Sequence, residues 1–268
     1  MTSPRFITFE GIDGSGKSTQ ARRFADHLRG QGVDVVLTRE PGGSAGAEEI
    51  RQLVLTGDPD RWSAETEILL FTASRRDHLE KTIEPALAAG RHVVSDRFAD
   101  STRVYQGATR GDLRAMVDQL HKLVIKREPD LTFIIDMDPE VALSRSLARL
   151  GSTTPTNALQ NTVGATDRST QKNALQDMSS GPSRNALLGV DDAKQTKNAL
   201  LDTSQAETKN ALAGYSLPEN RFEEFGLSFQ ETLRHGFLAL AHANPQRCVL
   251  IDGNRTADQI ASEIAAYA

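Results

Sequence analysis

The chain has 268 residues, of which 38% are apolar, with a formal net charge of −5 at pH 7 and a pI of about 5.7. This length suits one large domain or two small ones, and the acidic balance argues against nucleic acid or a membrane surface as a partner, since both favour a basic face. The single cysteine, Cys248, excludes an internal disulfide and fits the reducing cytoplasm, and we expect neither a signal peptide nor a membrane span.

The first predicted strand, Arg5–Glu10, leads into a glycine-rich loop, Gly11–Ser18, and a predicted helix, Lys17–Arg29. The loop fits the phosphate-binding pattern G-x-x-x-x-G-K-[ST] without a mismatch. Its glycines let backbone N–H groups converge on phosphate oxygens at the helix N-terminus. Lys17 adds a positive charge for the β- and γ-phosphates, and the Ser18 hydroxyl is suited to hold Mg²⁺. The expected nucleotide-binding residues are Gly11, Ile12, Asp13, Gly14, Ser15, Gly16, Lys17, Ser18 and Thr19.

A second predicted strand, Val33–Thr38, ends in the segment Thr38–Gly43, which reads Thr-Arg-Glu-Pro-Gly-Gly. A proline followed by paired glycines predicts a tight loop. Taken alone, this segment is equally compatible with an ordinary turn. A helix, Ala45–Leu55, is predicted after it.

The next predicted helix, Ala64–Ala89, carries a candidate base-binding pair. Phe71 and Arg75 are four residues apart and therefore share one helix face. A flat ring beside a guanidinium suits a nucleobase, which can stack on the ring and accept hydrogen bonds at its edge. Without the other motifs, Phe71 would be assigned to the core and Arg75 to the solvent. His78 receives no role, and we expect its ring at the surface or only partly buried.

The third predicted strand, His92–Ser95, is followed by Asp96 and Arg97. An aspartate at the end of an apolar strand can bind Mg²⁺ directly or through water, so Ser18 and Asp96 are the candidate metal ligands. The planar fork of Arg97 suits a phosphate. A salt-bridged strand end is the alternative interpretation. The segment Ser101–Gly107 then supplies hydroxyl groups and an amide.

The remaining predicted elements alternate helix and strand, apart from one long polar segment. They are the helices Asp112–Lys126, Pro139–Leu150 and Glu219–Ala243 and the strands Leu131–Asp136 and Cys248–Asp252. Alternating, largely apolar strands and helices predict an α/β protein with a parallel sheet covered on both faces. Core packing best explains the aromatic stripe of the last helix: Phe222, Phe225, Phe229, Leu233 and Phe237. Cys248 is expected to be a small core residue.

Between Gly151 and Gly214 the composition changes. The segment has no aromatic residue, and the triplet Asn-Ala-Leu occurs five times in it. Its repeat units are shorter and more polar than those of solenoid proteins. We therefore predict a single domain, 1–268, that contains a polar, mostly disordered insertion at 151–216.

Taken together and in this order, these segments resemble the bacterial thymidylate kinases of the P-loop nucleoside monophosphate kinase family. The resemblance rests on Phe9–Thr19, Thr38–Gly43, Asp96–Phe98 and Tyr105–Gly107, and it extends over nearly everything outside the polar segment. It implies a three-layer P-loop NTPase fold with a five-stranded parallel sheet between helices. It also implies phosphoryl transfer from ATP to dTMP, giving dTDP and ADP for dTTP synthesis, with Mg²⁺ and in a homodimer.

The resemblance also implies roles for individual residues. The residues at the dTMP site would be Asp13, Arg51, Phe71, Arg75, Arg97, Ser101, Tyr105 and Gln106. Tyr105 falls where the family disfavours a ribose 2′-hydroxyl. Family members without an arginine in the phosphate loop use one from the lid over ATP. The catalytic residues would therefore be Lys17, Arg97 and Arg149, with Arg145 and Arg221 as the other lid candidates.

The insertion sits where the family has its short lid, and Asn220 stands where the family pattern has an aspartate. We expect altered lid closure, ATP affinity and turnover. Folding should be unaffected, because each doubling of loop length costs only about 0.6 kcal/mol. Deleting Ser152–Ala213 is thus expected to leave thermal unfolding unchanged and to change kcat and the KM for ATP. Unchanged steady-state constants for ATP would contradict this prediction.

Three alternatives remain open at this point: another nucleotide or nucleoside kinase, a P-loop switch or partition ATPase, and an inactive copy of a kinase. Phe71, Arg75 and Tyr105 favour a thymine deoxynucleotide over other substrates. The chain has no Asn-Lys-x-Asp guanine motif and no lysine near the start of the phosphate loop, which argues against a switch or partition protein. The intact phosphate loop and Asp96 argue against an inactive copy.

Overall fold

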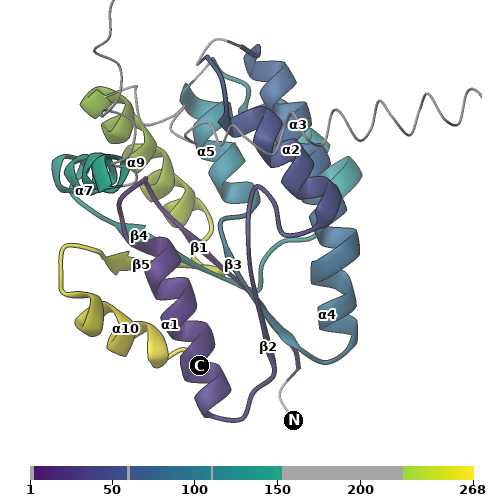
Figure 1. Cartoon of the computed structure of the whole chain (residues 1–268), viewed down its shortest axis with the longest axis vertical. Coiled ribbons are helices and arrows are strands. Elements are labelled where there is room, and N and C mark those ends of the chain that lie inside the picture. Colours follow the sequence, from purple (N-terminus) through teal and green to yellow (C-terminus); the bar gives the residue numbers. More distant parts are fainter. Residues whose placement is uncertain (1–2, 59–60, 110, 153–225) are drawn as a thin grey trace, which may run out of the picture. The chain divides into compact units, whose positions relative to one another are not determined.

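The computed structural model describes residues 3–58, 61–109, 111–152 and 226–268 and contains a five-stranded sheet in the order β2-β3-β1-β4-β5 (Figure 1). All four neighbouring strand pairs are parallel. The strands are β1 (Phe6–Glu10), β2 (Val35–Arg39), β3 (His92–Asp96), β4 (Leu131–Asp136) and β5 (Cys248–Asp252). The predicted α/β fold with five parallel strands is confirmed.

One or more helical segments follow each strand. They are α1 (Lys17–Gly30), α2 (Ala45–Leu55), α3 (Ala64–His78), η1 (Leu79–Ile83), α4 (Glu84–Ala88), α5 (Ala99–Thr109), α6 (Arg114–Leu120), η2 (His121–Ile125), α7 (Pro139–Ser152), α9 (Gly226–Ala243) and α10 (Ala257–Ala265). The predicted helix Ala64–Ala89 is divided by the π-helical turn η1, and the predicted helix Asp112–Lys126 ends in the π-helical turn η2. None of the described helices is long and apolar enough to cross a lipid bilayer.

Helices α5 and α10 were not predicted. Residues 102–107 of α5 are all buried, so this helix has no solvent-facing polar stripe from which a 3.6-residue period could be read. In contrast, α10 has a signal that could have been used. Thr256 and Gln259 form a reciprocal capping box at its N-terminus, and Ile260 and Ile264 face the core.

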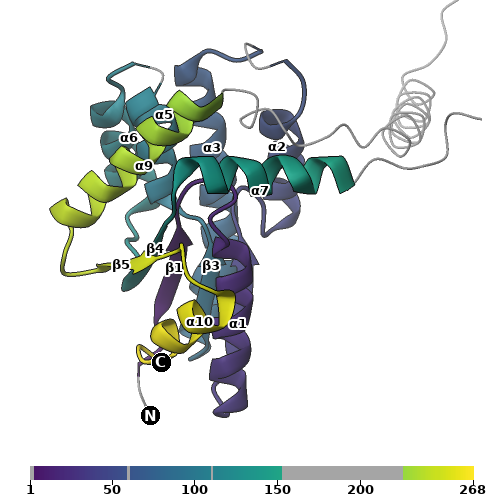
Figure 2. The ribbon, with the colours of Figure 1, turned by 90° about the vertical axis from the view of Figure 1, so that its left-hand side faces the viewer.

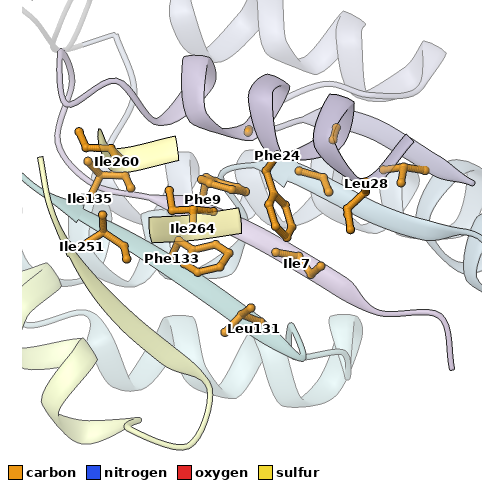
Figure 3. Packing of buried hydrophobic residues seen from close by; sticks show 14 residues of the cluster. Ile7, Phe9, Phe24, Leu28, Leu131, Phe133, Ile135, Ile251, Ile260 and Ile264 are labelled. Carbon is orange, nitrogen blue, oxygen red and sulfur yellow. The ribbon is translucent and has the colours of Figure 1, made fainter. Parts of the chain in front are cut away.

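One face of the sheet is covered by α1 and α10 (Figures 1 and 2). Phe24 of α1 points toward Phe9 of β1 and Phe133 of β4, as Figure 3 shows. The ring centroids of Phe9 and Phe133 are 5.1 Å apart, and those of Phe24 and Phe133 are 5.7 Å apart. Ile260 and Ile264 of α10 complete this cluster. The opposite face carries α4, α5 and α9.

Every residue of β1 is buried, as expected for a parallel strand covered on both sides. On the second face, Phe229, Leu233 and Phe237 of α9 pack as predicted, and so does Cys248. Phe222 and Phe225 lie outside the described residues, as does the predicted insertion beyond the last residues of α7. The described residues belong to one unit of the chain, Met1–Thr154 with Pro218–Ala268.

The carboxyl ends of β1, β2 and β3 meet at one edge of the sheet, because the strands are parallel and neighbouring. The loop Gly11–Ser18 follows β1, the loop after Arg39 follows β2, and Arg97 follows β3. In open parallel sheets this edge is where ligands bind. The fold therefore brings the three predicted motifs together.

Candidate active site

The loop Gly11–Ser18 owes its shape to glycines at positive φ. Gly14 has a φ of 85°, and a Cβ atom at this position would lie 1.9 Å from the carbonyl oxygen of Ala142 in α7. Only glycine permits this approach of the loop to α7. Gly16 has a φ of 94°, and a Cβ atom there would meet nothing within 4 Å. The loop is thus closed on the α7 side and open at Gly16, next to the N-terminus of α1, where a phosphate can approach the backbone.

A cavity of about 210 Å³ adjoins this loop. Its lining includes Asp13, Gly14, Gly16, Lys17, Ser18, Thr19, Arg39, Arg51, Asp96 and Arg97. Of the predicted nucleotide-binding residues, Ile12 is buried in the core and contributes its carbonyl oxygen, which accepts a hydrogen bond from Lys17 Nζ at 3.1 Å. Four cationic side chains (Lys17, Arg39, Arg51 and Arg97) line the cavity beside three carboxylates, one of them from Glu40, and the cations suit the phosphates of a nucleotide.

Asp13 lies at the centre of the charged groups. Its Oδ1 atom accepts a hydrogen bond from Lys17 Nζ at 3.2 Å and a shorter one from Arg97 Nη2. Its Oδ2 atom accepts from the Tyr105 hydroxyl at 2.8 Å. One carboxylate thereby connects the lysine of the phosphate loop with the arginine that follows β3.

The contacts of Asp13 with Lys17 and Arg97 shift the pKa values of these buried side chains. Burial alone would raise the pKa of Asp13, but the charges of Arg97 and Lys17 hold it well below its usual range. Burial and the charge of Arg97 lower the pKa of Lys17, against the opposing effect of Asp13. Burial raises the pKa of Tyr105, so its hydroxyl stays protonated. Asp13 is therefore an anion held between two cations.

Arg97 is held by its backbone as well as by its side chain. It has a φ of 73°, which is uncommon for a residue with a Cβ atom, and its N–H donates to the carbonyl oxygen of Phe9 at 2.9 Å. Its Nη1 atom donates to Ser101 Oγ at 3.0 Å, and its guanidinium carbon lies 5.0 Å from the centroid of the Tyr105 ring. The guanidinium is thus fixed in the lining of the cavity.

A second, smaller cavity of about 70 Å³ adjoins the first. It is lined by Asp13, Glu40, Pro41, Phe71, Arg75, Arg97, Ser101, Thr102, Tyr105 and Gln106. Seven of the eight residues predicted for the dTMP site are among them. The eighth, Arg51, lines the first cavity and donates from Nη1 to the carbonyl oxygen of Pro41 at 2.7 Å.

Arg75 is held by residues that the sequence analysis did not assign. Its Nε atom donates to Glu40 Oε2 at 2.7 Å, and its Nη2 atom donates to Thr102 Oγ1 at 3.0 Å. Behind Glu40 lies His78, whose side chain is 0% exposed. The expectation of a surface or partly buried imidazole is therefore wrong. The spacing of Arg75 and His78, three residues apart on one helix face, is the signal that could have placed both toward the same partner.

Glu10 is a further missed residue. It ends β1, is completely buried, and accepts hydrogen bonds from the Phe98 N–H at 2.7 Å and from Ser101 Oγ at 2.6 Å. Burial and the nearby charge of Asp100 raise the pKa of Glu10 from 4.5 to about 7. No sequence pattern indicates this shift, because it depends on contacts with residues of α5.

The pKa of Glu10 predicts that stability depends on pH. The folded protein holds this proton up to about pH 7, whereas the unfolded chain releases it near pH 4.5. The folded state therefore binds more protons in that window, and its stability falls as the pH rises through 7. In Glu10→Gln the amide oxygen can accept from the Phe98 N–H and the amide nitrogen can donate to Ser101 Oγ. This variant should remove about 1 kcal/mol of the loss between pH 6 and pH 8. Urea unfolding of both proteins at the two pH values measures the difference, and equal pH dependence would contradict it.

Two oxygen groups fit a magnesium ion. Asp96 Oδ1 is buried and has no hydrogen-bond partner among the described residues, although it lies beside a cavity. The Ser18 hydroxyl lines the same cavity. Mg²⁺ prefers oxygen ligands and is usually held by one or two protein groups together with phosphate oxygens and water. The residues present therefore suit this ion.

The arginines predicted for the lid are only partly placed. Arg149 lies on α7 and Arg221 lies beyond the described residues; the side chain of Arg149 is also outside what the structure describes. Arg145 of α7 lines a third cavity of about 480 Å³ beside the phosphate loop, together with Arg255. Its Nη1 atom lies 3.3 Å from the sulfur of Met137.

Comparisons with known proteins give matches over most or all of the chain. Residues 9–173 match the family model described as thymidylate kinase. The chain is 54% identical to the thymidylate kinase of Dinoroseobacter shibae, over 100% of this chain and 98% of the relative. It is 38% identical to the thymidylate kinase of Caulobacter vibrioides, over 99% of this chain and 96% of the relative. The crystal structure of thymidylate kinase from Ehrlichia chaffeensis has a TM-score of 0.61 and 29% sequence identity, and the match covers 99% of both chains.

Proposed function

The chain belongs to the thymidylate kinase family and is an enzyme that phosphorylates dTMP, and we propose that it does so with the two adjoining cavities described above. In this proposal, the phosphate loop holds the ATP phosphates and the smaller cavity holds the base of dTMP. The observation that carries the proposal is the position of Asp13 and Arg97. Both residues line both cavities, at the point where the two phosphate groups must meet.

The reaction requires positioning and charge stabilisation rather than a protein nucleophile. A phosphate oxygen of dTMP forms a bond to the γ-phosphorus of ATP. The bond from that phosphorus to the β,γ-bridging oxygen breaks, and ADP leaves. Lys17 and Arg97 stabilise the negative charge on the transferred group, with Arg149 as the third cation. Arg51, on the wall of the larger cavity, helps to hold the dTMP phosphate.

Ser18 and Asp96 would hold Mg²⁺, because both line the cavity beside the phosphate loop and Asp96 Oδ1 is a buried oxygen without a hydrogen-bond partner among the described residues. When bound, the ion neutralises charge on the β- and γ-phosphates. The chain's own contribution is to keep both oxygens at the cavity while Lys17 stays bound to the loop.

For the acceptor, Phe71 would stack on thymine and Arg75 would hydrogen-bond its edge. Phe71 is 9% exposed and lines the smaller cavity beside Arg75. Ser101 and Gln106 of α5 line the same cavity. Tyr105, whose hydroxyl donates to Asp13, would disfavour a ribose 2′-hydroxyl.

A coupled assay for ADP, run in parallel with dTMP, dUMP, dCMP and AMP, tests the proposal. We expect kcat/KM to be highest for dTMP. A preference for another nucleotide would point to a different nucleotide kinase, and ATP hydrolysis that needs no acceptor would point to a P-loop switch. Absence of activity with all four acceptors would indicate an inactive protein.

We also propose that the protein is a homodimer, as its family resemblance implies. Two large apolar side chains on the adjacent helices α2 and α3 support this, since Leu53 is 41% exposed and Leu69 is 52% exposed. Burying such side chains is a typical contribution to a subunit interface. Sedimentation equilibrium measures the mass, and a monomer at micromolar concentration would contradict the proposal.

A further inference from the structure

Behind the smaller cavity lies a chain of buried hydrogen bonds that ends at Arg75. The Thr38 hydroxyl lies 2.7 Å from His78 Nε2, and His78 Nδ1 lies 3.1 Å from Glu40 Oε1. Glu40 Oε2 in turn accepts from Arg75 Nε at 2.7 Å. Three elements supply these residues: β2 provides Thr38, the loop after it provides Glu40, and α3 provides His78 and Arg75.

The hydrogen-bond roles along this chain are fixed by chemistry. A carboxylate only accepts, so both Arg75 and His78 must donate to Glu40. In the neutral imidazole, Nδ1 donates to Glu40 and Nε2 accepts the proton of the Thr38 hydroxyl. The imidazole is therefore held in one tautomer, and the Glu40 carboxylate is held at both oxygens.

The side chains of His78 and Glu40 are buried and closely packed. His78 is 0% exposed and the carboxylate of Glu40 is 4% exposed. A Cβ atom on Gly43 would lie 2.3 Å from His78 Nε2, so the loop after β2 lies directly against the ring. Thr82 Oγ1 donates to the carbonyl oxygen of Gly43 at 2.7 Å and holds the loop there. Buried polar groups in such a network are satisfied only in this geometry.

We propose that His78 is a positioning residue for substrate selection. Through Glu40 it orients the guanidinium of Arg75 toward the carbonyl edge of a pyrimidine base. Arginine only donates hydrogen bonds, and thymine offers a carbonyl oxygen where cytosine has an amino group. A correctly oriented Arg75 thus favours dTMP over dCMP, and a misoriented one loses this preference. The inference rests on the proposed function of the smaller cavity.

Two variants of similar size and polarity separate the role of each ring nitrogen. In His78→Asn the amide nitrogen takes the place of Nδ1 and can still donate to Glu40. In His78→Gln the amide reaches toward Thr38 instead and leaves Glu40 without this donor. We expect His78→Gln to raise the KM for dTMP about tenfold and to lower the ratio of kcat/KM for dTMP over dCMP by about the same factor. His78→Asn should stay within about threefold of the wild type in both.

We expect the KM for ATP to change less than about twofold in both variants. An unchanged KM for ATP indicates that the phosphate loop is intact. His92→Asn is a matched control, because His92 is also buried but lies at the start of β3, away from both cavities. It should leave the preference for dTMP over dCMP unchanged.

Equal dTMP constants and equal selectivity in His78→Asn and His78→Gln would overturn the proposal and leave His78 as a packing residue. Should His78→Gln fail to fold, Thr38→Val decides the question, since it removes the hydroxyl that fixes the ring. The proposal requires a higher KM for dTMP in Thr38→Val and is overturned by an unchanged one. A wild-type enzyme that does not prefer dTMP would instead contradict the proposed function.

Discussion

Replacing Lys17 by alanine is expected to lower kcat by at least about 10³-fold while the fold stays intact. Lys17 is the cation of the phosphate loop, and its Nζ atom bonds Ile12 O and Asp13, so it is already held where the ATP phosphates must lie. Its removal takes away one of the cations that stabilise the charge on the transferred group, and a 10³-fold loss corresponds to about 4 kcal/mol in the activation free energy. The coupled ADP assay measures kcat.

Stability should change little in Lys17→Ala, because Asp13 keeps Arg97 and Tyr105 as partners. Thermal unfolding monitored by circular dichroism tests this. Lys122→Ala is a suitable control, since Lys122 is an exposed lysine of η2 that lines neither cavity. It should retain kcat within about twofold. Turnover of Lys17→Ala at the wild-type rate would mean that the proposed mechanism is wrong.

The sequence predicts the parts of this site that depend on local geometry. The loop Gly11–Ser18 could be placed because its glycines and its position between a strand and a helix define a backbone conformation within eight residues. Asp96 and Arg97 could be placed because they follow an apolar strand. Parallel pairing then brings both to the same edge of the sheet as the phosphate loop.

The contacts that determine ionisation and orientation could not be predicted in this way. The hydrogen bond between His78 and Glu40 joins residues 38 positions apart, and that between Tyr105 and Asp13 joins residues 92 positions apart. Such pairs depend on how α3 and α5 pack on the sheet. For the same reason, the burial that raises the pKa of Glu10 to about 7 has no counterpart in the local sequence.

Replacing Arg97 by alanine is expected to lower kcat/KM for dTMP by about 10³-fold. This loss should exceed any change in the KM for ATP, because Arg97 lines both cavities whereas the phosphate loop retains Lys17 and its backbone N–H groups. Arg97→Lys should recover little of the activity. The two terminal nitrogens of Arg97 donate hydrogen bonds to Ser101 and Asp13 at the same time. The single ammonium group of a lysine cannot occupy both positions.

The connection through Asp13 makes a further outcome measurable. Because Asp13 bonds both cations, Lys17→Ala and Arg97→Ala remove parts of one charged unit, and their effects on kcat/KM should not be additive. The double variant is therefore expected to lose less activity than the product of the two single losses. Steady-state kinetics of the three variants with dTMP gives the coupling. If the loss in the double variant equals the product of the two single losses, Lys17 and Arg97 act independently. The contacts of Asp13 with both cations would then have only a structural role.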